Sequence, residues 1–306
     1  MAGLLTTADP AAARQRATLI GAIAPLLWAT LALLTTYAQP LPAFELVAMT
    51  FGTAFLLTLG KWAIEAARGG ASVASHFRLP GQAWAVGVGG LFLYHLFYFN
   101  ALARAPAVEV SLICYLWPLL TVLLSAFMPG ERLRPTHILG TLCGLAGAGL
   151  LVTKGQGLGF DPAYGLGYLA AIACAFTWAG YSLLSRRLSS VPSDAVGAFC
   201  GATALLGLLS HLAFEPWVAP SFGNLAAILA LGLGPVGIAF FVWDHGVKHG
   251  DIQALGTLSY ASPLLSTLLL VLAGRAGPSW VLAGGALLIV GGAALAAGGL
   301  FARRSR

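Results

Sequence analysis

Ten long apolar segments follow one another along the chain, and they constrain its fold more than any other feature. Each is close to the ~20 residues that a helix needs to cross a hydrocarbon layer ~30 Å thick. Only 8% of the 306 residues are charged, and the short connections leave no room for a soluble domain. We therefore predict an all-α membrane protein with ten transmembrane helices. Their expected bounds are 18–37, 44–62, 82–103, 107–128, 136–152, 164–184, 195–214, 225–243, 252–273 and 278–299.

The distribution of Lys and Arg predicts how these helices are oriented. If the N-terminus is cytoplasmic, 13 of the 16 basic residues lie at inner ends, and the outer ends hold only Arg104, Lys154 and Arg275. Basic residues near span ends are retained on the cytoplasmic side. We therefore expect an N-terminal tail (1–17) and a basic C-terminal tail (300–306), both cytoplasmic. The net charge of +6 then reflects topology and attraction to anionic membrane lipid, so we predict no nucleic-acid partner.

An internal repeat divides the chain into two halves. CYLWPLL, residues 114–120, matches SYASPLL, residues 259–265, at four of seven positions and at an offset of 145. At an offset of 150, Trp28-Ala29 matches Trp178-Ala179. The halves, 18–152 and 164–299, contain five predicted spans each, and an odd number of spans inserts the second half upside down. Inverted repeats of this kind are typical of transporters.

Pro118 and Pro263 interrupt the corresponding spans of the two halves, the fourth and the ninth. Proline has no N–H, so each should free the carbonyl four residues earlier, that of Cys114 and that of Ser259. In lipid, such a carbonyl is tolerated only where protein, water or a ligand supplies a donor. We therefore expect both helices to line a central cavity, with the two prolines as hinges. A packing kink satisfied by a neighbouring Ser or Thr is the alternative.

A helical projection at ~100° per residue predicts which side chains line that cavity. The third span carries Tyr94 and Tyr98 on one face with His95, the only ionisable side chain expected near the centre of a span. A polar residue at that depth indicates a functional site. The predicted substrate-binding residues are Trp28, Tyr94, His95, Tyr98, Tyr115, Trp117, Trp178, Tyr181, Ser259 and Tyr260.

Structural roles are the alternatives for these residues. His95 would then be a neutral imidazole bonded to a tyrosine or a carbonyl. The repeat equivalents of Tyr94 and His95 at an offset of 144 are Ile238 and Ala239, so we assign the polar pair to substrate choice. Tryptophans also form belts at membrane interfaces. That is our prediction for Trp62, Trp84, Trp217, Trp243 and Trp280, near the span ends.

The sequence gives no support to an enzyme. It contains no Ser/His/Asp set, HExxH motif, paired carboxylates or phosphate loop. We therefore predict no catalytic residues, no metal and no cofactor. A nucleotide-sugar carrier would need Lys or Arg deep in the cavity to balance phosphate. None of the 16 basic residues is expected there.

Several motifs match a known family of carriers. GAIAPLLWA opens the first half, NALARAPAVEVSLICYLWPLL joins the third and fourth spans, and PGERL follows the fourth. This pattern resembles the EamA-type carriers of the drug/metabolite transporter superfamily over essentially the whole chain. The LYHLFYFN segment is most similar to the aromatic-amino-acid exporter subgroup. Arg275 departs from the pattern, because the first half has Glu131 at the equivalent position.

The resemblance implies a bacterial inner-membrane carrier that exports amino acids or related amphipathic metabolites by alternating access. We expect a monomer whose partners are its substrate and membrane lipid. We also expect facilitated export without proton coupling, because Glu45, Glu65, Glu109 and Asp244 lie at span ends and a desolvated His95 should be uncharged. The alternatives are an exporter of other small metabolites or cationic drugs, and a nucleotide-sugar-type carrier.

Overall fold

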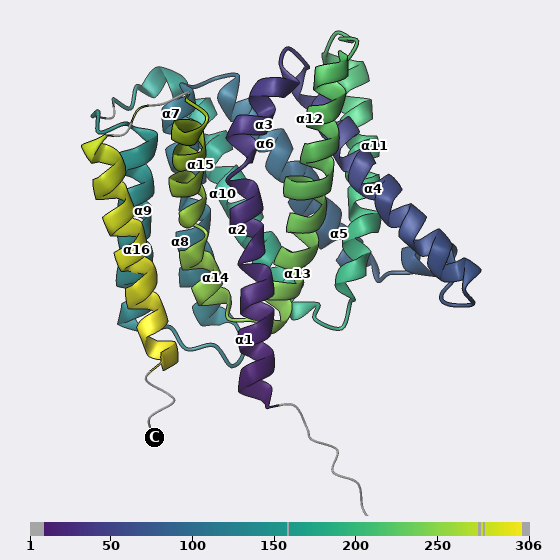
Figure 1. Cartoon of the computed structure of the whole chain (residues 1–306), viewed down its shortest axis with the longest axis horizontal. Helices are drawn as coiled ribbons and strands as arrows, with labels where there is room; N and C mark the ends of the chain where they lie inside the picture. Colours follow the sequence, from purple (N-terminus) through teal and green to yellow (C-terminus); the bar gives the residue numbers. More distant parts are fainter. Residues whose placement is uncertain (1–8, 158, 275–276, 278, 302–306) are drawn as a thin grey trace, which may run out of the picture.

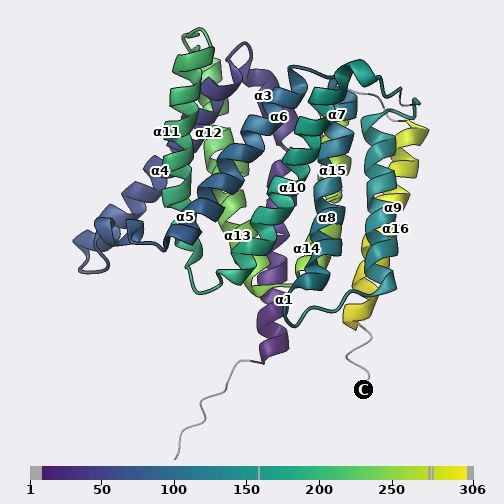
Figure 2. The same ribbon diagram turned by 180° about the vertical axis from the view of Figure 1, so that it is seen from behind.

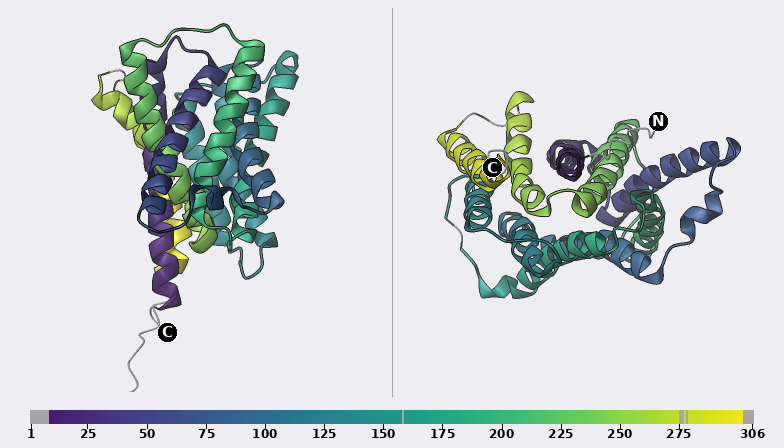
Figure 3. Two further views of the ribbon diagram at one scale, coloured as in Figure 1. Left: turned by 90° about the vertical axis from the view of Figure 1, so that its right-hand side faces the viewer. Right: turned by 90° about the horizontal axis from the view of Figure 1, so that it is seen from below.

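The computed structural model describes residues 9–157, 159–274, 277 and 279–301, and the regular elements in this part of the chain are all helices (Figure 1). Arg275, residues 1–8 of the expected N-terminal tail and residues 302–306 of the basic tail lie outside the described residues. Most helices stand side by side in one bundle, and α4 tilts away from it (Figures 1 and 2). Seen from below, α1 lies inside an arc of the other helices (Figure 3).

The element bounds follow most of the predicted segments, but the first helix begins at Pro10, so residues 10–17 of the predicted N-terminal tail are helical. The first half contains α1 (Pro10–Gly21), α2 (Ile23–Trp28), α3 (Leu31–Ala38), α4 (Ala43–Ala67), η1 (Val73–Phe77), α5 (Gly81–Val88), η2 (Gly89–Leu93), α6 (Tyr94–Leu102), α7 (Ala107–Cys114), α8 (Leu116–Leu124), η3 (Ser125–Phe127) and α9 (Pro135–Val152). The second half contains η4 (Pro162–Tyr164), α10 (Gly165–Arg187), η5 (Ser193–Ala195), α11 (Val196–Phe214), α12 (Phe222–Leu233), η6 (Gly234–Ile238), α13 (Ala239–His249), α14 (Ile252–Leu258), α15 (Ala261–Leu272) and α16 (Trp280–Phe301).

Eight helical segments of the described chain are long and apolar enough to cross a membrane. The helices Pro10–Trp28 and Leu31–Ala38, bent by 40° at their junction, make a ninth if they count as one span, and Trp280–Ala296 is a shorter apolar helix. The all-α membrane class is thus confirmed, and the count of ten stays a prediction. The eighth span, predicted to end at residue 243, continues to His249. Asp244 and Lys248 therefore lie inside a helix, where both are buried.

Polar side chains cap the N-termini of several helices, which explains where these helices begin. Asp9 precedes α1 and accepts the N–H of Ala11, with Pro10 in the first turn. Ser221 and Asn224 form a capping box at the start of α12. Asp251 accepts the N–H groups of two residues in the first turn of α14. Each cap satisfies backbone donors that have no partner within the helix.

The two halves interrupt their helices at matching positions. Two π-helical segments, η2 and η6, start 145 residues apart, at Gly89 and Gly234. The fourth span breaks at Tyr115, between α7 and α8, and the ninth breaks at Ser259 and Tyr260, between α14 and α15. The breaks lie just before Pro118 and Pro263, where the missing N–H leaves the helix one bond short. The interruptions therefore follow the repeat that the sequence contains.

Small residues let the last helices of the two halves pack closely. Side chains added at Gly140 and Gly147 of α9 would place Cβ only 2.4 Å and 2.8 Å from carbonyl oxygens of α16. Small residues at such spacing permit close contact between membrane helices. In Figures 1 and 2, α9 and α16 run side by side at one edge of the bundle. We call the end at which α1 begins the base of the bundle, and the opposite end the upper end.

Candidate functional site

Four tryptophan side chains meet in the core of the bundle, and we call them the tryptophan cluster. They are Trp28 of α2, Trp117 of α8, Trp178 of α10 and Trp243 of α13, two from each half. The ring centroid of Trp28 lies 5.2 Å from that of Trp243, 5.4 Å from Trp178 and 6.1 Å from Trp117. Aromatic pairs of this kind add about 0.5–1.5 kcal/mol each beyond the burial of their area. The cluster therefore holds the two halves together at their centre.

Two of the tryptophans predicted to lie at membrane interfaces are instead buried. Trp243 is fully buried, and its N–H donates to the hydroxyl of Ser182 at 3.1 Å. Trp62 is also fully buried, because η1 covers it and His76 stacks on its ring at 4.4 Å. Neither ring therefore faces lipid, as a residue of an interfacial belt would. The repeat could have predicted that Trp243 lies in the core, because at an offset of 145 it is the equivalent of Tyr98, a predicted site residue.

The indole N–H groups of the cluster differ in their hydrogen bonds. Trp28 donates to the carbonyl oxygen of Pro235 in η6 at 3.1 Å. The N–H of Trp178 is buried and has no acceptor among the described residues. The hydroxyl of Tyr181, whose ring lies 5.2 Å from that of Trp178, is also buried and lies beside Ser185. Leaving such an N–H unpaired costs about 1–3 kcal/mol. The N–H of Trp178 is therefore the group of the tryptophan cluster that a ligand acceptor would satisfy.

The polar face of the third span lies against the tryptophan cluster. Tyr94, His95 and Tyr98 belong to α6, which begins directly after the π-helical segment η2. The ring of Tyr94 lies 5.2 Å from that of Trp178 and stacks on Tyr98 at 6.2 Å. All three side chains are half-buried, and π-helical segments are frequent at functional sites. Ring contacts thus join seven of the ten predicted site residues in one group.

The orientation of the His95 ring is set by a backbone carbonyl. Nδ1 lies 2.7 Å from the carbonyl oxygen of Leu91, and the ring packs edge-on against Phe51 at 5.2 Å. A carbonyl only accepts hydrogen bonds, so Nδ1 carries the proton. In a neutral imidazole, Nε2 is then an acceptor. The hydrogen bond to a carbonyl, which we expected if His95 has a structural role, is therefore present. Nε2 can still accept a hydrogen bond from a ligand.

The other three predicted residues, Tyr115, Ser259 and Tyr260, are not joined to this group by ring contacts, although the side chain of Tyr115 lies near Tyr94 and Tyr98. The hydroxyl of Tyr260 donates to the carbonyl of Tyr115 at 3.0 Å, and Tyr260 packs in a separate core cluster between α9, α15 and α16. The hydroxyl of Ser259 donates to the carbonyl of Leu255 at 2.8 Å. The carbonyl of Ser259, predicted to be free for a ligand, accepts the N–H of Ser262 at 3.1 Å. These hydrogen bonds give the three residues a role in stabilising the fold.

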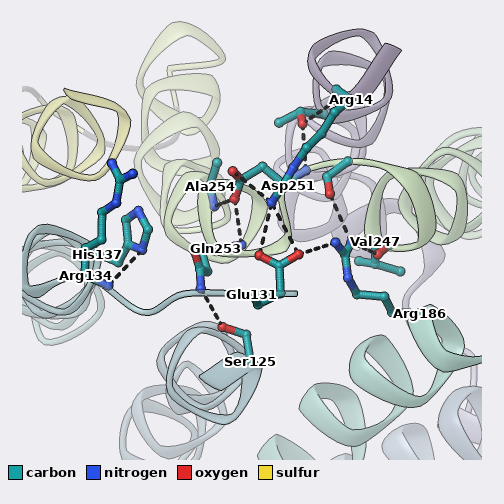
Figure 4. A network of polar contacts seen from close by, with 12 residues as sticks. Arg14, Ser125, Glu131, Arg134, His137, Arg186, Val247, Asp251, Gln253 and Ala254 are labelled. Carbon is teal, nitrogen blue, oxygen red and sulfur yellow. Dashed lines mark hydrogen bonds and ion pairs between the residues drawn. The ribbon is translucent and has the colours of Figure 1, made fainter. Parts of the chain in front are cut away.

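Charged side chains from distant segments meet at the base of the bundle, and we call them the base network (Figure 4). Glu131 accepts hydrogen bonds from both Arg14 and Arg186, and its side chain is only 4% exposed. Arg14 also lies 3.3 Å from Asp251, and Arg186 donates to the carbonyl of Val247 at 2.7 Å. The base network therefore connects α1 and α10 with the segments that precede α9 and α14.

The sequence provides no equivalent of the base network at the other end. Offsets of 150 and 144 relate its four charged residues to positions in the opposite half. Those equivalents, in the order Arg14, Arg186, Glu131 and Asp251, are Tyr164, Thr36, Arg275 and Ala107. These four equivalents include one basic residue and no acidic residue. The repeat therefore provides the network of paired acidic and basic side chains at one end only.

We predict that Tyr260→Phe destabilises the protein, because it leaves the carbonyl of Tyr115 without its donor. The expected loss is about 1–3 kcal/mol in the free energy of unfolding. Tyr164→Phe is the matched control, because the side chain of Tyr164 is 39% exposed and water can replace what its hydroxyl bonds, so stability should stay close to wild type. Thermal unfolding in detergent micelles measures both. Equal melting temperatures for the two variants would contradict the assigned role of Tyr260.

A bundle of apolar helices, interrupted at matching positions in two halves and joined at an aromatic centre, defines a membrane transporter. The sequence pattern of the EamA-like transporter family matches the chain twice, over residues 15–153 and 165–298. The chain therefore belongs to the EamA-like transporter family.

Known relatives agree with this assignment. The chain is 54% identical to the aromatic amino acid exporter YddG of Ancylobacter novellus. The aligned 274 residues cover 88% of this chain and 93% of the relative. It is 27% identical to the exporter of the same name from Escherichia coli, over 90% of this chain and 94% of the relative. A crystal structure with 53% sequence identity superimposes with a TM-score of 0.87, covering 95% of this chain and 99% of the other.

The motif-based resemblance to EamA-type carriers, and to the aromatic amino acid exporter subgroup, is thereby confirmed. With its apolar helices, the chain is an integral membrane protein of the bacterial inner membrane. Several relatives are named as exporters, which agrees with the prediction of a transporter.

Proposed function

We propose that this chain exports amino acids with aromatic or other neutral side chains from the cytoplasm by alternating access. The proposal includes ten transmembrane helices in two inverted repeats, 18–152 and 164–299, with both termini cytoplasmic and a monomer as the working unit. The names of the relatives support the substrate class. The bias of Lys and Arg to one side supports the orientation.

The unpaired N–H of Trp178 is the observation that carries the proposal. It is buried in the tryptophan cluster and has no acceptor among the described residues. The carboxylate of an amino acid is a strong acceptor, because a charged partner makes a hydrogen bond about twice as strong as a neutral one. The hydroxyl of Tyr181, whose ring lies 5.2 Å from Trp178, is a second donor beside it.

The third-span face suits the other end of the same substrate. A primary ammonium donates hydrogen bonds, and Nε2 of neutral His95 accepts one. The ring faces of Tyr94 and Trp178 attract a cation by about 0.5–2 kcal/mol each. An aromatic substrate side chain would then leave water among the surrounding rings. The site offers these contacts without a full protein charge among its predicted residues, which favours a zwitterion over a nucleotide sugar.

The base network and the helix breaks support alternating access. The base network joins both halves at one end, which would be the cytoplasmic end in the proposed orientation. The breaks at Tyr115 and at Ser259 and Tyr260 give the fourth and ninth spans places to bend next to Pro118 and Pro263. Loading from the cytoplasm then requires the base network to open, with the two prolines as hinges.

Uptake into proteoliposomes tests the substrate class. We expect transport of labelled Phe and Trp, weaker transport of Thr and none of a nucleotide sugar. Trp178→Phe keeps the ring but removes the N–H, so the apparent affinity for amino acids should fall about tenfold or more. Trp280→Phe is the control, because that side chain is 92% exposed. His95→Ala should change the ranking of amino acids. Transport of the nucleotide sugar alone would refute the proposal.

We also predict that export is not coupled to protons or sodium. Two buried acidic residues of the described helices have partners: Asp244 pairs with Lys248 at 2.7 Å, and Glu109 accepts from the hydroxyl of Tyr168. Glu45 lies in the first turn of α4, at the end of its span. His95 is bonded through Nδ1 and has no acidic partner among the described residues. Liposomes with equal substrate on both sides and an imposed pH or sodium gradient provide the measurement. Accumulation that an ionophore abolishes would show coupling and contradict the prediction.

Removing one charge from the base network should open the base. Glu131→Gln leaves Arg14 and Arg186 without their shared carboxylate, so the base should separate more often. Spin labels at Arg132→Cys and Arg187→Cys, exposed base positions from the two halves, report this distance by pulsed electron resonance. We expect a longer and broader distance distribution. Glu109→Gln, at a carboxylate outside the base network, is the control. An unchanged distribution in Glu131→Gln would exclude the gating role.

A further inference from the structure

A carboxylate is buried at the upper end, between α4 and α11, and it lies outside the site described above. Glu45, in the first turn of α4, is 1% exposed. Its Oε2 accepts the N–H of Val218 at 3.2 Å, whereas Oε1 is buried and has no hydrogen-bond partner among the described residues. A buried carboxylate oxygen without a donor is costly. The position therefore calls for a donor from outside the chain.

The charges around Glu45 favour a cation as that donor. His211 lies between two carboxylates, with Nδ1 3.1 Å from Glu215 and Nε2 4.0 Å from Glu45. Glu215 also accepts the N–H groups of Phe44 and Glu45, which caps the start of α4. One imidazole carries at most one positive charge against the two carboxylates. When both are ionised, at least one negative charge is left without a counter-charge in a buried place.

A cavity of about 290 Å³ lies beside Glu45 and shows what kind of molecule fits. Its walls come from α4, α11 and the segment that follows α11. The lining residues are Glu45, Ala48, Met49, Ala204, Leu205, Leu208, His211 and Trp217. Leu205 and Leu208 are 57% and 39% exposed on an apolar helix long enough to cross the membrane, so they face lipid. The cavity thus has apolar walls toward the membrane and a carboxylate at its polar end.

Trp217 completes the polar end of the cavity. Its ring lies 5.5 Å from that of His211, and the side chain is 61% exposed. An indole face attracts cations, and tryptophan is favoured at the depth of lipid headgroups. A carboxylate and an indole at the mouth of an apolar cavity are suited to an amphiphile with a cationic head.

We propose that this cavity binds a membrane phospholipid whose headgroup ends in a primary ammonium, such as phosphatidylethanolamine. The ammonium has three N–H donors, and in the cavity it would lie beside the carboxylate of Glu45 and the ring of Trp217. The glyceride part lies along Leu205 and Leu208. The proposal depends on the membrane location of the chain and is independent of the transported substrate.

Native mass spectrometry of the purified protein tests this assignment. The protein is exposed to equal amounts of phosphatidylethanolamine, phosphatidylcholine and phosphatidylglycerol. We expect wild-type protein to retain phosphatidylethanolamine about tenfold better than phosphatidylcholine, because a quaternary ammonium has no N–H to donate. Glu45→Gln keeps the shape and the acceptor for Val218 but removes the charge, so it should lose this preference. Trp217→Ala, at an exposed position, should weaken retention while the Glu45 charge is intact.

Glu65→Gln is the matched control, because it makes the same change at the other end of α4 and should retain the lipid like wild type. Free ethanolamine distinguishes the source of the ammonium. If it raises the melting temperature as much as phosphatidylethanolamine does, the site belongs to a soluble amine and the lipid assignment is wrong. Equal retention of the three lipids by wild-type protein, or unchanged preference in Glu45→Gln, would overturn the proposal. Transport of amino acids by these variants is measured separately, so the two proposals fail independently.

Discussion

Every backbone carbonyl that a broken helix frees inside the membrane must find a donor, and the structure depends on how this chain supplies those donors. Side-chain hydrogen bonds to backbone carbonyls cross from one half of the chain to the other. Three of them are the bonds from Tyr260 to the carbonyl of Tyr115, from Trp28 to that of Pro235, and from Ser262 to that of Pro25. The points where the helices are weakest are therefore also points where the two halves are joined. A movement of one half against the other must exchange these bonds.

The two halves share a backbone plan but not a set of side chains. The π-helical segments and the helix breaks recur at an offset of 145 because they follow from the spacing of Gly and Pro in each repeat. His95 has no polar equivalent, since the matching position of α13 is Ala239 at an offset of 144 and Phe240 at an offset of 145. Likewise Glu131 corresponds to Arg275. The repeated helix breaks define the backbone arrangement of the two halves. His95, which is not repeated, distinguishes the candidate site from the rest of the bundle, and Glu131 distinguishes one end of the bundle from the other.

The buried acids of this chain fall into two kinds according to their partners. Asp244 is paired with Lys248 at 2.7 Å, and Glu131 is held by two arginines, so both have donors within the protein. Glu45 keeps one oxygen without a donor among the described residues. A buried charge with partners holds segments together, whereas one that lacks a donor is a place for a ligand. The same distinction applies to two tryptophans. The N–H of Trp28 is bonded within the protein, whereas that of Trp178 has no acceptor in the described chain and is the one that a ligand could satisfy.

The sequence alone determined the membrane class, the positions of most spans and the interruptions near Pro118 and Pro263, because hydrophobic length and missing N–H groups act locally along a chain. It also placed Tyr94, His95 and Trp178 among the candidates, since polar and aromatic residues at membrane depth are rare. Only the tertiary structure decided which candidates meet. It buried Trp243 in the cluster, assigned Tyr260 to a carbonyl of the other half, and brought Arg14, Glu131 and Arg186 together. A periodicity reports the face of one helix, whereas these contacts depend on which faces of different helices pack against one another.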